Sequence, residues 1–240
     1  MLEVVEIIKQ MEQGYTKPYL CQADNQEEYV VKGASANGKG RICEWIAGHL
    51  GKKLDLPIPE FEIIDVPEYL ISGDTDLIIE MGVGPAFASK YIPFTQEINH
   101  TLLASMRADQ LRDIFIFDYW IKNEDRKFTR HGGNPNLLVD LSNQSLIVFD
   151  HNHAFDPEFN LEDFKSEHIG RNHWFQEQMD LLVIEELKAK MRSALTHLDD
   201  ILDNIPREWF SCSTVTSSLL DTIRANLEYF EDNQFWEALQ

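Results

Sequence analysis

Two kinds of hydrophobic pattern divide this chain of 240 residues near position 93, and this division constrains its fold more than any other feature. Before position 93, short apolar runs separated by turn-forming residues predict strands. After it, apolar residues recur at the spacing of amphipathic helices. Segregated strand and helix regions favour an α+β fold over a doubly wound sheet. We therefore expect two lobes, a strand-rich one over residues 1–93 and a mainly helical one over residues 94–240.

The strand-rich region begins, in our prediction, with an acidic amphipathic helix over MLEVVEIIKQMEQ, residues 1–13. Residues 18–23 and 28–33 flank the turn-rich DNQE and predict a hairpin. A helix is expected over residues 39–56, where apolar residues recur every three or four positions. Three further strands are predicted at EFEIIDV, DLIIEM and AFASKYI, residues 60–66, 76–81 and 86–92.

The region after position 93 is predicted to begin with helices over residues 95–106 and 107–123. A second hairpin follows, with strands NLLVD (136–140) and SLIVFD (145–150) joined at LSNQ.

From residue 164 onward the chain is expected to be helical, with periodic apolar faces over residues 180–205 and 214–239. Four aromatic residues of this half recur at helical spacing and are assigned to the core: Trp120, Trp174, Phe230 and Trp236.

Charge limits the classes of partner that this chain can have. Asp and Glu total 41 against 21 Lys and Arg, which gives a formal net charge of -20. Such an acidic chain repels nucleic acid and anionic lipid surfaces, so we expect neither nucleic acid nor a membrane as a direct partner. The cysteines are widely spaced without metal-ligand spacing, and no apolar run reaches transmembrane length. These features predict a cytoplasmic protein without structural disulfides.

Two polar stretches, NEDRKFTRHGGNPN and DHNHAF, adjoin the second hairpin at its entry and its exit. Because the entry of one strand lies beside the exit of its partner, Asn136 and Asp150 are expected to lie close together. An Asn amide oxygen and an Asp carboxylate are hard oxygen ligands, which suit Mg²⁺ together with the phosphates of a substrate. Asp125, held near the metal without binding it, can orient a hydroxyl and accept its proton. This set of residues predicts phosphoryl transfer.

The strand-rich region supplies the cationic and phosphate-binding groups. Lys32 lies at the end of an apolar strand, where an isolated ammonium group is unfavourable unless it meets an anion. Glu44, in the helix that follows, is placed to pair with it. Gly14, Thr16 and the backbone amides of EQGYTKPYL are candidate phosphate donors. The chain contains neither GxxxxGK[ST] nor GxGxxG, so this loop matches no common phosphate-binding motif.

These residues resemble the motifs of the HipA-like kinase family. The resemblance lies in YVVKG, the helical Glu44, NEDR followed by NLLVD, and IVFDHNHAF. TKPYLCQADNQEEYVVKG and ICEWIAGHLGKKLDLPIPEFEIIDV also resemble the start of the compact, stand-alone HipA-like domains. The same motifs recur in the type II phosphatidylinositol 4-kinases. The resemblance covers residues 14–156 and implies a two-lobed, protein-kinase-like fold.

The resemblance implies a site that binds ATP and Mg²⁺ and transfers the γ-phosphate to a hydroxyl, of a protein Ser or Thr. Lys32 would contact the nucleotide phosphates with Glu44 as its ion-pair partner, and the adenine would lie near residues 88–93. HipA relatives are often toxins of toxin–antitoxin pairs, which makes a regulatory partner protein compatible with the family. Nothing in this sequence marks a toxin or an antitoxin-binding surface.

The resemblance also assigns roles around the second hairpin. Asp125 would be the catalytic base, Asn136 a Mg²⁺ ligand, and Asp150 the Mg²⁺-binding acid equivalent to the aspartate of the kinase DFG motif. Arg126 would structure the catalytic loop. Family members commonly have a shorter spacing than the one that RKFTRHGGNP creates here. Asn134 is therefore an alternative Mg²⁺ ligand. We prefer Asn136, because Asn136 immediately precedes a strand.

Other interpretations remain open from the sequence. A non-catalytic module would keep the fold and bind a partner, and the long insertion between Asp125 and Asn136 keeps this alternative open. A kinase acting on a lipid or a small molecule fits the same motifs. His151 and His153 could form a metallohydrolase centre with Asp150 and His131. The densest basic cluster is either solvated surface or a positive patch beside the γ-phosphate, and it comprises Lys122, Arg126, Lys127 and Arg130.

Overall fold

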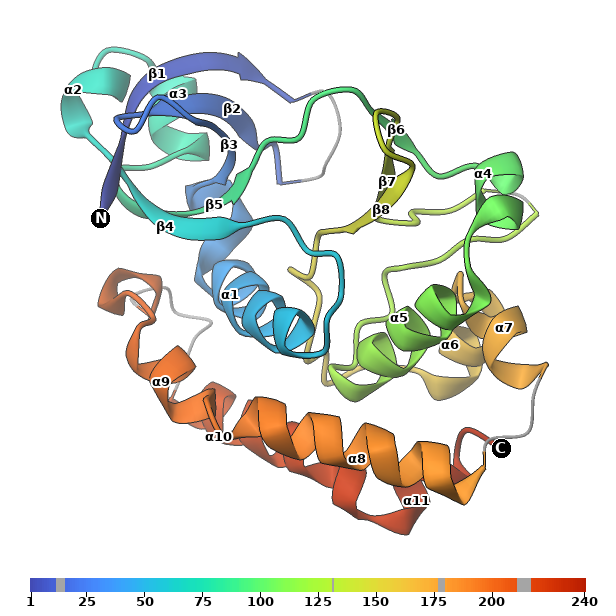
Figure 1. The fold of residues 1–240 in the computed structure, drawn as a ribbon. Coiled ribbons are helices and arrows are strands. Elements are labelled where there is room, and N and C mark those ends of the chain that lie inside the picture. The colour runs from blue at the N-terminus through green and yellow to red at the C-terminus, as the bar shows by residue number, and fades with distance from the viewer. Residues whose placement is uncertain (12–15, 131, 177–179, 211–216) are drawn as a thin grey trace.

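The computed structural model describes residues 1–11, 16–130, 132–176, 180–210 and 217–240, and it begins with a closed β-barrel (Figure 1). The strands follow one another around the barrel in the order β1, β2, β3, β5, β4. Their side chains fill the barrel with a core of its own. The strands are β1 (Leu2–Gln10), β2 (Tyr19–Ala23), β3 (Glu28–Lys32), β4 (Phe61–Val66) and β5 (Gly84–Lys90).

The hairpin predicted over residues 18–33 is confirmed as β2 and β3, which pair antiparallel. The strands predicted at residues 60–66 and 86–92 are confirmed as β4 and β5. β3 lies between β2 and β5, and in its register Lys32 is opposite Phe87. Lys32 is therefore the last residue of a strand that is paired on both sides.

The helix predicted over residues 1–13 is wrong, because residues 2–10 form β1. β1 pairs antiparallel with β2 and parallel with β4, and so closes the barrel. Its register along β2 shifts twice. Such irregularities break the strict alternation of a strand, and the remaining apolar spacing imitates a helix. The free edges of β2 and β4, which the local pattern does not contain, decide the outcome.

The strand predicted at residues 76–81 is also wrong. This segment forms α3 (Thr75–Glu80), preceded by the short α2 (Glu68–Ile71). The Asp74 carboxylate caps α3 by accepting hydrogen bonds from the amides of Asp76 and Leu77 at 3.0 and 3.1 Å. This cap outweighs the strand propensity of the two isoleucines that follow it in the sequence.

The helix predicted over residues 39–56 is confirmed as α1 (Asn37–Lys53), which a single 3₁₀ turn (Ala34–Ala36) joins to β3. α1 lies between the barrel and the helices at the end of the chain (Figure 1). Its side chains belong to the largest hydrophobic core, shared with α5 and the C-terminal helices. The position of α1 therefore depends on both halves of the chain.

A second sheet lies beside the barrel and has the order β6 (Thr95–Glu97), β7 (Leu137–Asp140), β8 (Ser145–Val148). The predicted hairpin is confirmed as β7 and β8. The helix predicted over residues 95–106 is wrong at its start, because β6 pairs with β7. Asn99 caps the helix that follows, α4 (His100–Ser105). The partner strand β7 lies more than forty residues later in the sequence, so local periodicity could not indicate that residues 95–97 form a strand.

α5 (Ala108–Trp120) forms as the sequence predicted. The two long helices predicted over residues 180–205 and 214–239 are each broken. The aromatic residues assigned to the core are all buried. Within the described residues, no helix combines the length and the apolar character that crossing a bilayer requires. The C-terminal elements are α6 (Leu161–Glu167), α7 (Arg171–Phe175), α8 (Leu181–Leu195), α9 (Leu198–Asp203), a 3₁₀ turn (Arg207–Phe210), α10 (Ser217–Glu228), a 3₁₀ turn (Tyr229–Glu231) and α11 (Asn233–Glu237).

Candidate active site

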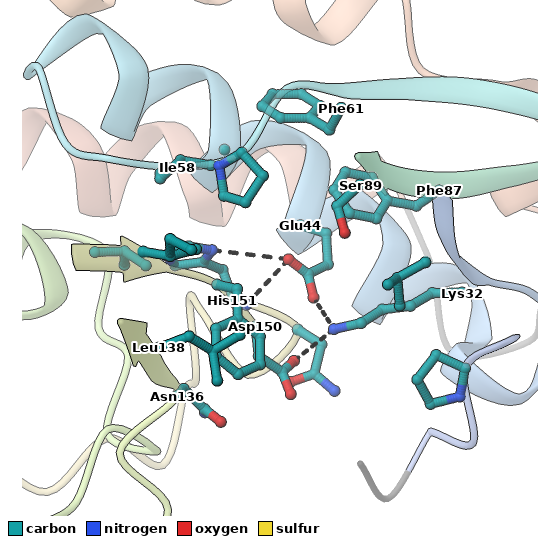
Figure 2. A pocket seen from close by; sticks show the side chains of 18 of the residues that line it. Lys32, Glu44, Ile58, Phe61, Phe87, Ser89, Asn136, Leu138, Asp150 and His151 are labelled. Carbon is teal, nitrogen blue, oxygen red and sulfur yellow. Dashed lines mark hydrogen bonds and ion pairs between the residues drawn. The ribbon is translucent and has the colours of Figure 1, made fainter. Parts of the chain in front are cut away.

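A pocket of about 400 Å³ lies between the barrel and the β6–β7–β8 sheet. Its wall is apolar at one end and polar at the other (Figure 2). The sequence-predicted residues that line it are Thr16, Lys32, Glu44, Asp125, Asn134, Asn136 and Asp150. Arg126 does not line the pocket, and Gly14 lies outside the described residues.

Lys32 meets two carboxylates at the polar end. Its ammonium group is 2.7 Å from Asp150 Oδ1 and also forms an ion pair with Glu44 Oε1, as Figure 2 shows. Burial alone lowers the pKa of Lys32, but Asp150 and Glu44 outweigh it and raise this pKa above its ordinary value. Lys32 therefore stays charged although it is buried.

Glu44 connects α1 to the loop after β8. Besides its contact with Lys32, its carboxylate accepts a hydrogen bond from the backbone amide of His151 at 3.0 Å. Burial raises the pKa of Glu44, but the charge of Lys32 and the nearby side chain of His151 reverse this and hold it below its usual range. Glu44 is therefore an ionised, fully partnered link between the two halves of the pocket.

Asp125 is held by two asparagines. Its Oδ2 accepts hydrogen bonds from Asn134 Nδ2 at 2.8 Å and from Asn136 Nδ2 at 2.9 Å. Asn136 is buried at the start of β7, whereas Asn134 is exposed. Because each amide nitrogen donates to Asp125, each amide oxygen remains the group able to bind a cation.

Asn136 and Asp150 lie at the same end of the β7–β8 hairpin, as its geometry predicts. The amide of Phe149 donates to the carbonyl oxygen of Asn136 at 3.3 Å across the two strands. An Asn oxygen and an Asp carboxylate thus lie near one another, with Lys32 on the barrel side. This is a donor set suited to Mg²⁺ with phosphate oxygens, since Mg²⁺ takes few protein ligands in such sites.

The insertion after Asp125 does not separate the residues that flank it. Lys127 N donates to Asn134 O at 3.1 Å, so the two ends of the insertion meet. Thr129 and Gly132 form a bridge of their own beyond that point. The described residues of the insertion therefore form a side loop, and the contact between Asp125 and Asn136 is kept.

The basic cluster is not one surface patch. Arg126 is fully buried and paired with Asp118, whereas Lys127 contacts the carboxylates of Glu124 and Glu167. The Lys122 ammonium group donates to Asn226 in α10. Both sequence interpretations of the cluster are therefore wrong for Arg126, because a buried acid that precedes it in sequence draws its side chain inward.

Several buried polar atoms of the pocket wall have no hydrogen-bond partner among the described residues. They are Thr16 Oγ1, His151 Nε2 and Asn152 Oδ1. Buried polar groups in folded proteins are nearly always paired, so these atoms fit a pocket that receives a polar ligand. Thr16 is held by its backbone, since its carbonyl oxygen accepts from Ser35 Oγ at 2.5 Å.

The metallohydrolase interpretation finds no support in the described part of the chain. There, no group of three or more His, Cys, Asp or Glu side chains could hold a metal ion. His151 is buried against Glu44 and Phe117, whereas His153 is exposed. His131, the remaining candidate ligand, lies outside the described residues.

The apolar end of the pocket contains residues that the sequence reasoning missed. The segment expected near the adenine, residues 88–93, does contribute Ser89, Lys90, Tyr91 and Ile92 to the wall. Further apolar residues of the wall lie on β3, β4, β5, β7 and β8, and include Val30, Phe61, Phe87, Leu138 and Ile147. Strand alternation alone could not distinguish this face of the barrel from the filled interior.

Comparison with known proteins gives the same fold. A family model described as HipA-like kinase matches residues 4–239. The solved structure of the Helicobacter pylori proinflammatory kinase CtkA is 13% identical, with a TM-score of 0.59, over 97% of this chain and 94% of that chain. The Golgi casein kinase, solved with Mn/ADP bound, is 11% identical, with a TM-score of 0.57, over 100% of this chain and 73% of that chain. No curated protein matches the sequence. At these identities the solved structures show the fold alone, which is protein-kinase-like.

Proposed function

The chain belongs to the HipA-like kinase family, and from this premise we propose that it transfers the γ-phosphate of ATP, with Mg²⁺, to a Ser or Thr hydroxyl of a protein. In this proposal residues 1–93 and 94–240 are two lobes with the nucleotide between them. The observation that carries the proposal is the pair of contacts from Lys32 to Glu44 and Asp150 at the wall of the pocket.

Each side chain of the polar end has a role in the proposal. Lys32, kept extended by Glu44, binds the phosphates of the nucleotide. Asp150 and the amide oxygen of Asn136 would hold Mg²⁺, which supplies positive charge to the phosphate oxygens. Asp125 orients the acceptor hydroxyl and receives its proton.

The different positions of Asn134 and Asn136 support different roles for them. Asn136 is buried beside Asp150 at the hairpin end, so we assign it to the metal. Asn134 is exposed, and like Asn136 it donates a hydrogen bond to the Asp125 carboxylate. We assign Asn134 to the orientation of the Asp125 carboxylate.

The substrates follow from shape and charge. The apolar end of the pocket fits a nucleotide base, with the residues of β3, β5 and β7 on either side of it. A net charge of -20 disfavours nucleic acid and anionic membranes as partners, so the proposed acceptor is a protein, in the cytoplasm.

The test is label transfer from γ-labelled ATP with Mg²⁺ to proteins of a cell lysate or to the chain itself. Asp125→Ala and Asp150→Ala are compared with wild type, and Asp221→Ala, an exposed acid on α10, is the matched control. We expect labelling to fall by about 100-fold or more in the first two variants and to be unchanged in the control.

Three outcomes would contradict parts of the proposal. Unchanged labelling in Asp150→Ala would remove the metal assignment. If label appeared in the lipid or small-molecule fraction of the lysate and not in protein, the acceptor would be a lipid or a small molecule and not a protein. Wild-type protein that binds ATP but labels nothing would indicate a non-catalytic binding module.

A further inference from the structure

A buried acid in α5, Asp118, lies at the centre of a polar cluster behind the pocket. Its carboxylate contacts Arg126 Nε at 2.6 Å, Asn123 Nδ2 at 2.9 Å and His168 Nε2 at 2.9 Å. All four side chains are 0–1% exposed. Taking such charged groups out of water is strongly unfavourable, and apolar residues in place of a buried ion pair are often equally or more stable, so the cluster indicates a role beyond stability.

The hydrogen-bond directions in this cluster require a carboxylate at position 118. The amide of Gly170 donates to His168 Nδ1 at 3.0 Å, so the proton of the neutral imidazole is on Nε2 and faces Asp118. Arg126 Nε and Asn123 Nδ2 are donors as well. Only an ionised carboxylate, which accepts at both oxygens and donates at neither, satisfies these three partners together.

The other end of Arg126 reaches the backbone of the proposed metal site. Its guanidinium group donates to the carbonyl oxygen of Asn136 at 2.5 Å and to that of Phe149 at 3.2 Å. These carbonyls belong to one proposed metal ligand and to the residue before the other. Asn123 forms a second connection, since its Oδ1 accepts from the amide of Asp125 at 3.4 Å.

His168 connects the cluster to the segment after α6. Phe128 N donates to Glu167 O at 2.9 Å and Ile169 N donates to Arg126 O at 3.1 Å, so the two segments run side by side. Hydrogen bonds of both its side chains and its backbone therefore hold the loop that carries Asp125 in place.

We propose that Asp118 and His168 are positioning residues for the proposed phosphotransfer, acting through Arg126. They do not line the pocket, but they determine where the backbone at Asp125, Asn136 and Asp150 lies. This inference rests on the proposed function. The sequence carries a signal for it, an acid within the apolar helix IFIFDYWI that precedes NEDR.

Asp118→Asn is the direct test. An Asn side chain keeps the volume, but its amide group must face one of the three donors, so at least one hydrogen bond is lost. We expect kcat to fall by about 10- to 100-fold, as for outer-shell residues of metal sites, with little change in the KM for ATP. We also expect the gain in Tm on adding Mg²⁺ to the ADP-bound protein to disappear.

A second pair of variants keeps the inference testable if Asp118→Asn does not fold. His168→Leu removes the donor, whereas His168→Gln retains an amide that can donate to Asp118. We expect the Leu variant to behave as Asp118→Asn does and the Gln variant to recover part of the kcat and of the Mg²⁺-dependent gain in Tm.

Trp174→Phe is the matched control for lost stability. It removes a buried donor, Trp174 Nε1 to Leu239 O at 3.2 Å, from a ring that packs on the same Phe115 as His168. Hydrogen exchange of the nucleotide-free protein provides a readout independent of activity. Exchange at residues 123–136 and 149–151 should accelerate in Asp118→Asn or His168→Leu and not in Trp174→Phe.

The outcomes separate this inference from the proposed function. If the folded variants keep the wild-type kcat, exchange rates and Mg²⁺-dependent gain in Tm, the inference is overturned while wild-type activity leaves the proposed function standing. If wild-type protein itself transfers no phosphate and gains no stability from Mg²⁺ with ADP, the proposed function is overturned, and the inference with it.

Discussion

Asn136 and Asp150 share a backbone conformation that residues other than glycine adopt at a cost. Their φ angles are +46° and +60°, in the left-handed region. Such strain, of order 1 kcal/mol for each residue, persists where the surroundings overdetermine the conformation. Here the surroundings are the guanidinium group of Arg126 and the cross-strand hydrogen bond from Phe149. Several other described residues, among them Lys122 and Phe155, also have a positive φ, but these two are the ones that we assign to the metal.

His49 gives the stability of the fold a pH dependence near neutrality. Its ring, in α1, lies between those of Trp45 and Phe61, with centroids 4.3 and 4.8 Å away. Burial, and then the charge of Lys52, lowers its pKa from 6.5 to about 4. Between these values the unfolded chain binds the proton more readily, so stability falls as the pH is lowered from about 6.5.

We expect His49→Gln, which cannot titrate, to lose less stability than wild type between pH 7.5 and pH 5. The measurement is Tm by differential scanning calorimetry at several pH values in this interval. The other histidines contribute equally to both proteins, so the difference between the two slopes reports His49. Parallel slopes would contradict the prediction.

At the scale of elements, α1 is the part on which the site depends. It carries Glu44, and it is fastened by residues far along the chain. Trp45 Nε1 donates to Ile201 O at 3.0 Å, and Trp209 Nε1 donates to Pro85 O in β5 at 2.8 Å. The C-terminal helices therefore hold α1 against the barrel in the orientation in which Glu44 meets Lys32.

Trp45→Phe tests this dependence. It removes the donor to Ile201 O, and we expect the free energy of unfolding to fall by about 1 kcal/mol and the KM for ATP to rise. Trp236→Phe, which removes the donor to Phe230 O at 2.8 Å, is the control. It should lower the free energy of unfolding in urea similarly and leave KM unchanged. Equal KM values in the two variants would show that α1 does not need this hydrogen bond.

At the scale of the whole molecule, charge opposes the fold. A net charge of -20 produces self-repulsion that the exposed ion pairs offset only weakly. Raising the ionic strength from about 0.01 M to about 0.15 M shortens the screening length from about 30 Å to about 8 Å. We expect Tm to rise over this range of NaCl. Sucrose of equal osmolality is the control, and a Tm that falls with NaCl would show that local ion pairs outweigh the net repulsion.

Local pattern was sufficient for the elements whose neighbours in space are also neighbours in sequence. The β2–β3 and β7–β8 hairpins and α1 formed as predicted, because turn residues and periodic apolar faces lie within each segment. The family was likewise visible, in the few polar residues at the ends of those elements. The contact between Asn136 and the Asp150 end of the hairpin follows from antiparallel pairing alone.

Tertiary structure decided what depends on a distant partner. β1 is a strand because β2 and β4 offer it two edges, and β6 is a strand because β7 offers it one. Arg126 is buried because Asp118 and the backbone of the hairpin accept its hydrogen bonds. The charged residues and the hairpins could be identified from the sequence alone. Which charges are buried depends on the fold, because the free-energy cost of taking them out of water is offset by partners that are distant in sequence.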